Sequence, residues 1–101
     1  MRVGKESSER TACLRIRNLR AGKVLFYLEP WGEQYTMAPN DVFQIVAHGP
    51  EGGCLELEYR EDDITLYGWT GCAVSVFQDG VELGAGSFDR AAVPPLPNDN
   101  K

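Results

Sequence analysis

The sequence predicts an all-β fold, a single-domain antiparallel β-sandwich or a small barrel of seven or eight short strands. Apolar residues recur at every second position in several short segments, which is typical of half-buried strands, and no segment of useful length shows the helical repeat. Eleven glycines and six prolines provide many tight turns. A chain of 101 residues is long enough for one domain with its own core. The pattern does not separate a sandwich from a barrel.

The first half of the chain is expected to form four strands. Residues 11–17 alternate leucine and isoleucine with arginine, whereas residues 23–29 are apolar on both faces, as in the central strand of a sheet. Turns rich in glycine, proline, asparagine or aspartate separate these segments. The strands expected here are residues 11–17, 23–29, 33–37 and 42–48.

The second half is expected to form a meander of three hairpins, because one register in each hairpin keeps the apolar residues on one face. Asp79-Gly80 is the strongest short signal for a hairpin turn, and Gly71 stands where a three-residue loop requires a left-handed residue. The expected cross-strand pairs are Tyr59 with Ile64 and Leu57 with Leu66 in the first hairpin, Leu66 with Val74 and Ile64 with Val76 in the second, and Val76 with Leu83 and Gln78 with Val81 in the third.

The β domain is expected to span residues 11–85. Residues 1–10 are polar and predict a flexible N-terminal segment, and residues 86–101 are rich in proline and predict a mobile tail. The N-terminus has no apolar stretch of the kind found in signal peptides, and no apolar run is long enough to cross a bilayer. These features predict a cytoplasmic protein.

The formal net charge of −5 disfavours binding to nucleic acid and to anionic membranes. One basic cluster, formed by Arg15, Arg17, Arg20 and Lys23, is interpreted as a solvated face of a strand. The three cysteines, Cys13, Cys54 and Cys72, are an odd number at wide spacings, which predicts reduced thiols rather than a disulfide framework.

Candidate catalytic and metal-binding groups are sparse. The one histidine, His48, excludes a type 1 copper site, and the cysteines lack the paired close spacing of structural zinc sites. The carboxylate pairs Glu56 with Glu58 and Glu29 with Glu33 lack a predicted cleft that could shift one pKa for acid and base catalysis. The sequence therefore predicts no enzyme, no metal and no cofactor, and chemistry by Glu29, Glu33 or His48 is kept as a remote alternative.

Both tryptophans stand in turns, each beside a tyrosine. Trp31 with Tyr35 and Trp69 with Tyr67 would offer a rigid aromatic surface for a sugar ring or for a side chain of a partner. The structural alternative, which we favour, is that each tryptophan folds back over an open end of the core. The candidate binding surface comprises Trp31, Tyr35, Tyr67, Trp69, Glu29 and Glu33.

The run Leu28-Glu29-Pro30-Trp31-Gly32-Glu33-Gln34-Tyr35, with the later Pro39-Asn40-Asp41 and Tyr67-Gly68-Trp69, resembles an uncharacterised family of short bacterial proteins that share a Leu-Glu-Pro-Trp-Gly signature. The resemblance covers residues 11–84 and implies a bacterial cytoplasmic protein. This family has no assigned activity, so no catalytic residue is carried over.

These observations lead to two expectations about function. The first is a non-enzymatic β-sandwich module that binds a protein partner or itself, through an exposed sheet edge at the first or last strand or through the aromatic turns. The alternative is a small-ligand or carbohydrate-binding domain in which Trp31 and Trp69 are stacking platforms.

Overall fold

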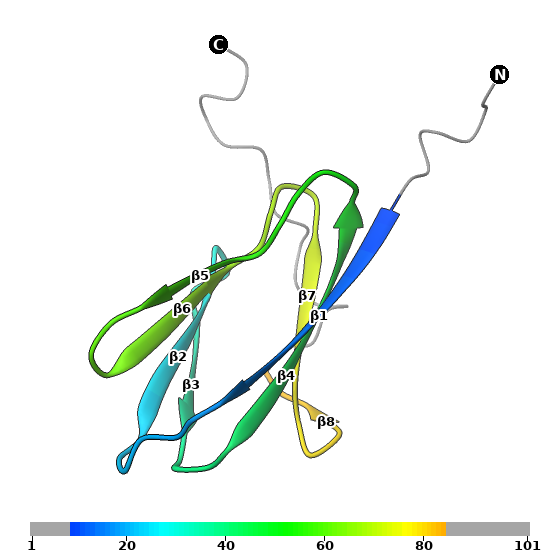
Figure 1. The fold of residues 1–101 in the computed structure, drawn as a ribbon. Coiled ribbons are helices and arrows are strands. Elements are labelled where there is room, and N and C mark those ends of the chain that lie inside the picture. Colours follow the sequence, from blue (N-terminus) through cyan, green and yellow to red (C-terminus); the bar gives the residue numbers. More distant parts are fainter. Residues whose placement is uncertain (1–8, 85–101) are drawn as a thin grey trace, which may run out of the picture.

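The computed structural model describes residues 9–84, which form eight strands in two four-stranded sheets (Figure 1). The strands are β1 (Glu9–Arg17), β2 (Val24–Glu29), β3 (Glu33–Met37), β4 (Val42–Pro50), β5 (Glu56–Tyr59), β6 (Asp63–Tyr67), β7 (Ala73–Gln78) and β8 (Val81–Glu82). β1 begins two residues before the predicted domain boundary. The rest of the predicted flexible N-terminal segment, and the predicted mobile tail, lie outside the described residues.

The all-β prediction is confirmed, and the two sheets form a sandwich that is not closed into a barrel. The first sheet has the strand order β1-β4-β7-β8 and the second has the order β3-β2-β6-β5. The sheets occupy opposite sides of the molecule in Figure 1, with the second sheet on the left. Within residues 9–84, no helix is long and apolar enough to span a membrane.

The central position predicted for residues 23–29 is confirmed by β2. This strand pairs antiparallel with β3 on one side and parallel with β6 on the other. Val24, Phe26 and Leu28 are buried on its inner face, while Leu25 and Tyr27 are half-buried on its outer face. The apolar residues on both faces of β2 are therefore at least half-buried, as expected of a strand with a neighbour on each side.

Two of the three predicted hairpins are confirmed. In the first, Leu57 pairs with Leu66 and Tyr59 with Ile64. In the third, Gln78 pairs with Val81, and the Leu83 amide donates a hydrogen bond of 2.8 Å to the Val76 carbonyl. Asp79 and Gly80 both have positive φ, at 52° and 81°, as the Asp-Gly turn requires.

The predicted second hairpin is wrong, and with it the meander. β6 and β7 belong to different sheets, because β6 pairs with β2 and β7 pairs with β4. Leu66 and Val74 are both fully buried, as they would be as partners in one sheet. Residues that face each other from opposite sheets are buried in the same way, so matching apolar faces cannot tell the two arrangements apart. Gly71 does adopt the predicted left-handed conformation, with φ of 84°, but in a turn that crosses between the sheets.

The core lies between the two sheets. Phe26 of β2 and Phe43 of β4 meet edge to face across it, with ring centroids 5.5 Å apart, so an aromatic contact joins the two layers. The other buried apolar residues are Ile16, Val24, Leu28, Met37, Ile45, Ala47, Ile64, Leu66, Trp69, Cys72, Val74 and Val76. Every strand except β5 and β8 contributes to this set.

Candidate functional site

The structure brings both aromatic turns to one end of the second sheet. Glu29 at the end of β2 pairs with Tyr67 at the end of β6, and the Gly68 amide donates a 3.0 Å hydrogen bond to the Glu29 carbonyl. The turns that carry Trp31 and Trp69 follow directly after these paired residues. The turns that carry Trp31 and Trp69 therefore lie at the same end of the sheet, although 38 positions separate the two tryptophans in the sequence.

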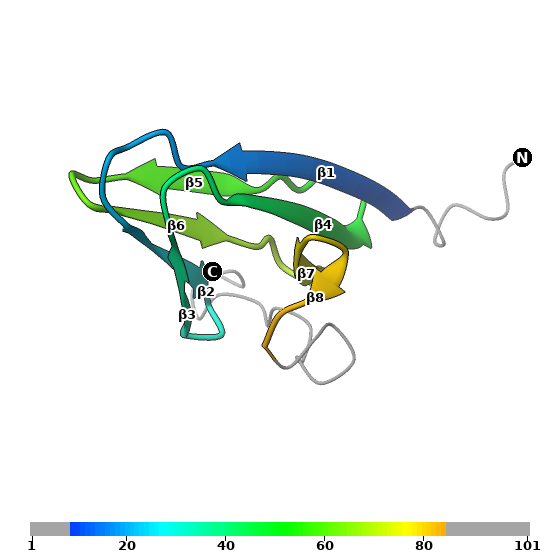
Figure 2. The same cartoon turned by 90° about the horizontal axis from the view of Figure 1, so that it is seen from below.

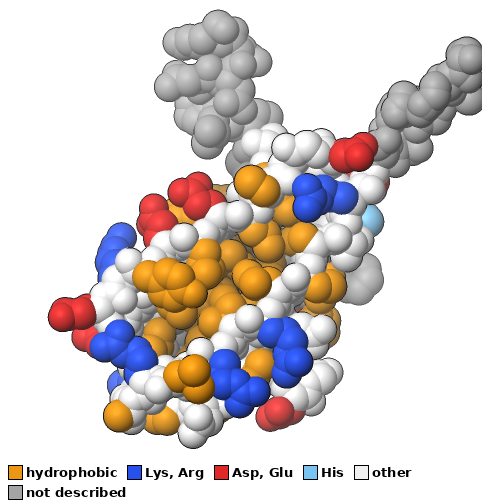
Figure 3. All heavy atoms as spheres, in the orientation of Figure 1, with side chains coloured by type: hydrophobic (Ala, Val, Ile, Leu, Met, Phe, Trp, Pro, Cys, Tyr) orange, Lys and Arg blue, Asp and Glu red, His pale blue; other side chains and the backbone are white. Residues whose placement is uncertain are grey.

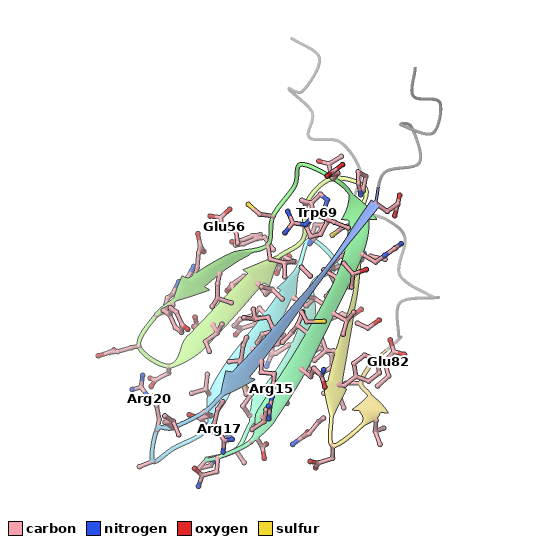
Figure 4. All side chains as sticks on the ribbon, turned by 45° about the vertical axis from the view of Figure 1, so that its right-hand side comes forward. Arg15, Arg17, Arg20, Glu56, Trp69 and Glu82 are labelled. Atoms are coloured by element: carbon pink, nitrogen blue, oxygen red, sulfur yellow. The ribbon has the colours of Figure 1, made fainter. Side chains whose placement is uncertain are left out.

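Trp69 is a buried cap on the core. Its side chain is 9% exposed, and its Nε1 donates a 2.8 Å hydrogen bond to the Pro50 carbonyl (Figure 4). Gly53 lies so close to the indole that a Cβ there would come within 1.9 Å of Cδ1. The Arg10 guanidinium lies 5.9 Å from the ring centroid. These contacts agree with the structural alternative for Trp69, and they leave no free indole face for stacking a ligand.

Trp31 and Tyr35 are half-buried and pack against the core. The Tyr35 ring meets Phe43 edge to face at 6.2 Å, and its hydroxyl donates a hydrogen bond to the Glu33 carboxylate. The candidate residues of this turn are therefore held by contacts inside the domain. Their arrangement supports a structural role for the Pro-Trp-Gly turn.

Tyr67 belongs to the outer face of the second sheet and not to the Trp69 cap. Its hydroxyl donates a 3.2 Å hydrogen bond to the Glu58 carboxylate. Burial, and secondly this hydrogen bond, raise the pKa of Tyr67 above its usual value. Since Leu66 and Trp69 face the core, Tyr67 and Trp69 do not form one aromatic platform.

Three of the hollows on the surface of residues 9–84 have neither Trp31 nor Trp69 in their lining. One, of about 110 Å³, lies between the loop after β1 and the turn after β5. The other two, of about 330 Å³ each, lie over the outer face of the first sheet and beside Tyr35 at the end of β3. Small-molecule sites are usually concave cavities of 300–1,000 Å³ that enclose the ligand. Of the candidate binding residues, Glu33 and Tyr35 line the hollow at the end of β3, whereas neither tryptophan lines any of these three.

The remote catalytic candidates are scattered. His48 is exposed on the first sheet, where its Nε2 lies 2.9 Å from the Glu9 carboxylate and its Nδ1 lies 3.1 Å from the Thr11 hydroxyl. Cys72 is buried, and burial raises the pKa of its thiol. Among residues 9–84, no three His, Cys, Asp or Glu side chains lie together as metal ligands. No described cluster combines a nucleophile with a base in a cleft.

A different surface stands out, which we call the open side. Within residues 9–84, β1 pairs only with β4 and β5 pairs only with β6, so each is an edge strand of its own sheet. The two edges lie on the same side of the sandwich and run in the same sense in Figures 1 and 2. The open side is the area between them, and its apolar residues are Ala12, Leu14, Leu55, Leu57 and Tyr59.

These residues leave part of the core uncovered. Leu14 of β1 and Leu57 of β5 face inward but are only half-buried, and both pack against the core cluster. Tyr59 pairs with the inward-facing Ile64, yet it is 70% exposed. Figure 3 shows a continuous hydrophobic area in the middle of this face, flanked by Lys and Arg side chains. Contiguous exposed apolar surface of this kind marks sites of interaction.

Arginines tie the two ends of the open side. At one end, Arg10 of β1 donates a 3.0 Å hydrogen bond to the Gly53 carbonyl, in the loop before β5. At the other end, Arg20 lies 3.4 Å from the Asp62 carboxylate and donates a hydrogen bond to the Glu61 carbonyl. The two sheets are therefore linked at both ends, while none of the described residues covers the middle of the open side.

The outer faces of the two edge strands carry opposite charges. Arg15 and Arg17 alternate with the inward residues of β1, and Glu56 and Glu58 alternate with those of β5. Figure 4 labels Arg15 and Arg17 on β1 and Glu56 on β5. The predicted exposure of the arginines is confirmed, but the sequence did not show that Arg15 and Arg17 lie on the edge strand of the first sheet, as they do among residues 9–84. The alternation of like charges along each strand was visible in the sequence, whereas the edge position was not.

Comparison with protein-family models, with curated proteins and with solved structures finds no match to this chain. The resemblance to short bacterial proteins with a Leu-Glu-Pro-Trp-Gly signature therefore stays a prediction.

Proposed function

We propose that this chain is a non-enzymatic interaction module that binds a protein through the open side of its sandwich. The observation that supports the proposal is the placement of two sheet edges, unpaired among residues 9–84, on either side of an exposed apolar strip. A free edge binds an added strand through its backbone N–H and C=O groups, and the side chains beside it supply specificity.

The open side offers both of these components. β1 provides an edge of nine residues, and β5 provides a shorter edge of four. A partner strand that covers Tyr59 and Leu57 would remove apolar surface from water, which contributes about 25 cal/mol per Å² before the cost of association. The exposed thiols of Cys13 and Cys54 suit a reducing compartment, and we propose a cytoplasmic location.

The carbohydrate-binding alternative has less support. It requires an accessible indole face at both turns, whereas Trp69 is 9% exposed and is covered by Gly53 and Arg10. We therefore place the interaction surface at the strand edges and not at the aromatic turns.

A photo-cross-linking amino acid at position 59 tests the proposal. The control carries the same amino acid at Val81 of β8, which is 63% exposed on the other sheet and away from the open side. Irradiation of cells that express the full chain should cross-link position 59, and not position 81, to one defined polypeptide segment. The absence of a cross-link at position 59, or equal cross-linking at both positions, would contradict the proposed function.

A further inference from the structure

We propose that the partner is a second copy of this chain, bound so that β1 of each copy pairs in parallel with β5 of the other. The inference rests on the proposed function of the open side and names its occupant. The resulting dimer would contain two continuous sheets, each built from four strands of one copy and four of the other.

The direction of the strands permits this arrangement. β1 and β5 lie in different layers on the same side of the molecule and run in the same sense. A two-fold axis that lies beside the open side, midway between the layers and parallel to the strands, turns the two open sides toward each other, exchanges the layers and keeps the strand direction. It therefore places β5 of one copy beside β1 of the other, in parallel orientation, at two equivalent positions. The pairing closes on itself, so it ends at a dimer and does not grow into a filament.

Charge selects this pairing over the alternatives. The outer face of β1 carries Arg15 and Arg17, and the outer face of β5 carries Glu56 and Glu58. Pairing β1 with β5 places opposite charges on the same outer surface across the new junction. Pairing β1 with β1, or β5 with β5, would place like charges there, which is destabilising in a sheet. The chain therefore favours a β1–β5 junction and disfavours the two symmetric ones.

The inner faces also match at this junction. Because side chains alternate along a strand, a register that aligns the outer charges also aligns inner residues with inner residues. Leu14 on β1 then comes beside Leu57 or Tyr59 of β5 from the other copy, and the uncovered part of each core is closed by its equivalent. The arginine contacts at the ends of the open side involve Arg10 and Arg20 and leave the middle of both edges available.

Charge reversal tests the inference on the full chain. We expect light scattering on a sizing column to give twice the monomer mass for the unmodified protein. Arg15→Glu and Glu56→Lys should each weaken the dimer about tenfold or more. Each substitution is present at both junctions of the symmetric dimer, so its repulsion acts twice. Lys23→Glu and Glu51→Lys change the net charge by the same amounts at exposed sites outside the strand edges, and they should leave the dimer mass unchanged.

An equimolar mixture of Arg15→Glu and Glu56→Lys distinguishes the junctions. Each new charge then meets an opposite charge at a β1–β5 contact, so the mixture should form a heterodimer that neither variant forms alone. In a β1–β1 dimer the Glu56→Lys variant would stay dimeric by itself, and that result would overturn the inference. A larger assembly would also overturn it.

A measurement on the unmodified protein covers the case in which a variant fails to fold. The dimer mass should fall at high salt, because the charges at the junction lie at the surface. A mass equal to the monomer at low salt and at protein concentrations up to about 1 mM would overturn the inference. If the cross-link from position 59 then led to a different polypeptide, the proposed function would stand and the second copy would be excluded as its partner.

Discussion

Substitution of Gly53 by alanine should destabilise the domain by displacing the Trp69 cap. An added Cβ would lie 1.9 Å from Cδ1 and 2.1 Å from Cγ of the indole, whereas ordinary contacts begin at 3.4 Å. The ring, or the loop beside it, must therefore move by about 1.5 Å. A movement of that size would disrupt the 2.8 Å hydrogen bond between Nε1 and the Pro50 carbonyl.

The expected cost follows from these two effects. Overpacking of a buried site costs about 1–3 kcal/mol, and the net contribution of the hydrogen bond is about 1 kcal/mol. We therefore expect Gly53→Ala to lower the free energy of unfolding by about 2–4 kcal/mol, which corresponds to roughly 10–25 °C in Tm for a domain of this size. The displaced indole should also emit at longer wavelength in the folded state.

The assay is urea unfolding followed by circular dichroism, with Gly22→Ala as the matched control. A Cβ on Gly22 would meet no atom within 4 Å, so the same substitution there should leave stability unchanged or raise it by up to about 1 kcal/mol. If Gly53→Ala and Gly22→Ala differed by less than about 0.5 kcal/mol, the account of Trp69 as a tightly packed cap would be refuted.

Three further predictions concern individual side chains. The raised pKa of Tyr67 means that the folded state holds this proton more tightly than the unfolded chain, so the group has no effect on stability below about pH 10 and lowers stability as the pH rises above it. Tyr67→Phe should therefore lose less stability than the unmodified protein between about pH 9 and pH 11 in urea unfolding, and equal losses would contradict this. A thiol reagent should modify the exposed Cys13 and Cys54 in the folded protein, and the buried Cys72 only in urea. Rapid reaction of Cys72 in the folded state would contradict the buried position of its thiol. Arg20→Ala removes an exposed ion pair and should cost less than about 1 kcal/mol in the same unfolding assay, where a cost above 2 kcal/mol would point to a larger structural role for this arginine.

Local features of the fold could be predicted from the sequence because local chemistry determines them. The alternation of residues 11–17 and the two apolar faces of residues 23–29 gave strands that the structure contains as β1 and β2. The Asp79-Gly80 turn and the left-handed Gly71 follow from backbone sterics, which need no knowledge of distant residues.

The placement of strands into sheets could not be predicted in the same way. The segment from Gly68 to Cys72 has the length and glycine of a hairpin loop, but it carries the chain from one sheet to the other. What decides the crossing is long-range: β6 pairs parallel with β2, β7 pairs with β4, and the buried Trp69 lies in the loop between them.

The open side was missed for the same reason. The expectation of an exposed edge at the first strand agrees with β1, but β5 was expected inside a meander and not at a second edge. An edge is defined by the absence of a neighbour, so it depends on the pairing of every other strand in the sheet. The opposite charges of Arg15 and Glu56 indicate a junction between β1 and β5 only once both strands are known to be edges.

Amide hydrogen exchange of the unmodified protein at low and high concentration tests the central claim most directly. The claim predicts that amides on the free edges of β1 and β5 become protected as the concentration rises, while those of β3, the opposite edge of the second sheet, exchange at an unchanged rate. Protection that rises equally at β3, or that does not change at β1 and β5 over the whole range of concentration, would contradict the account.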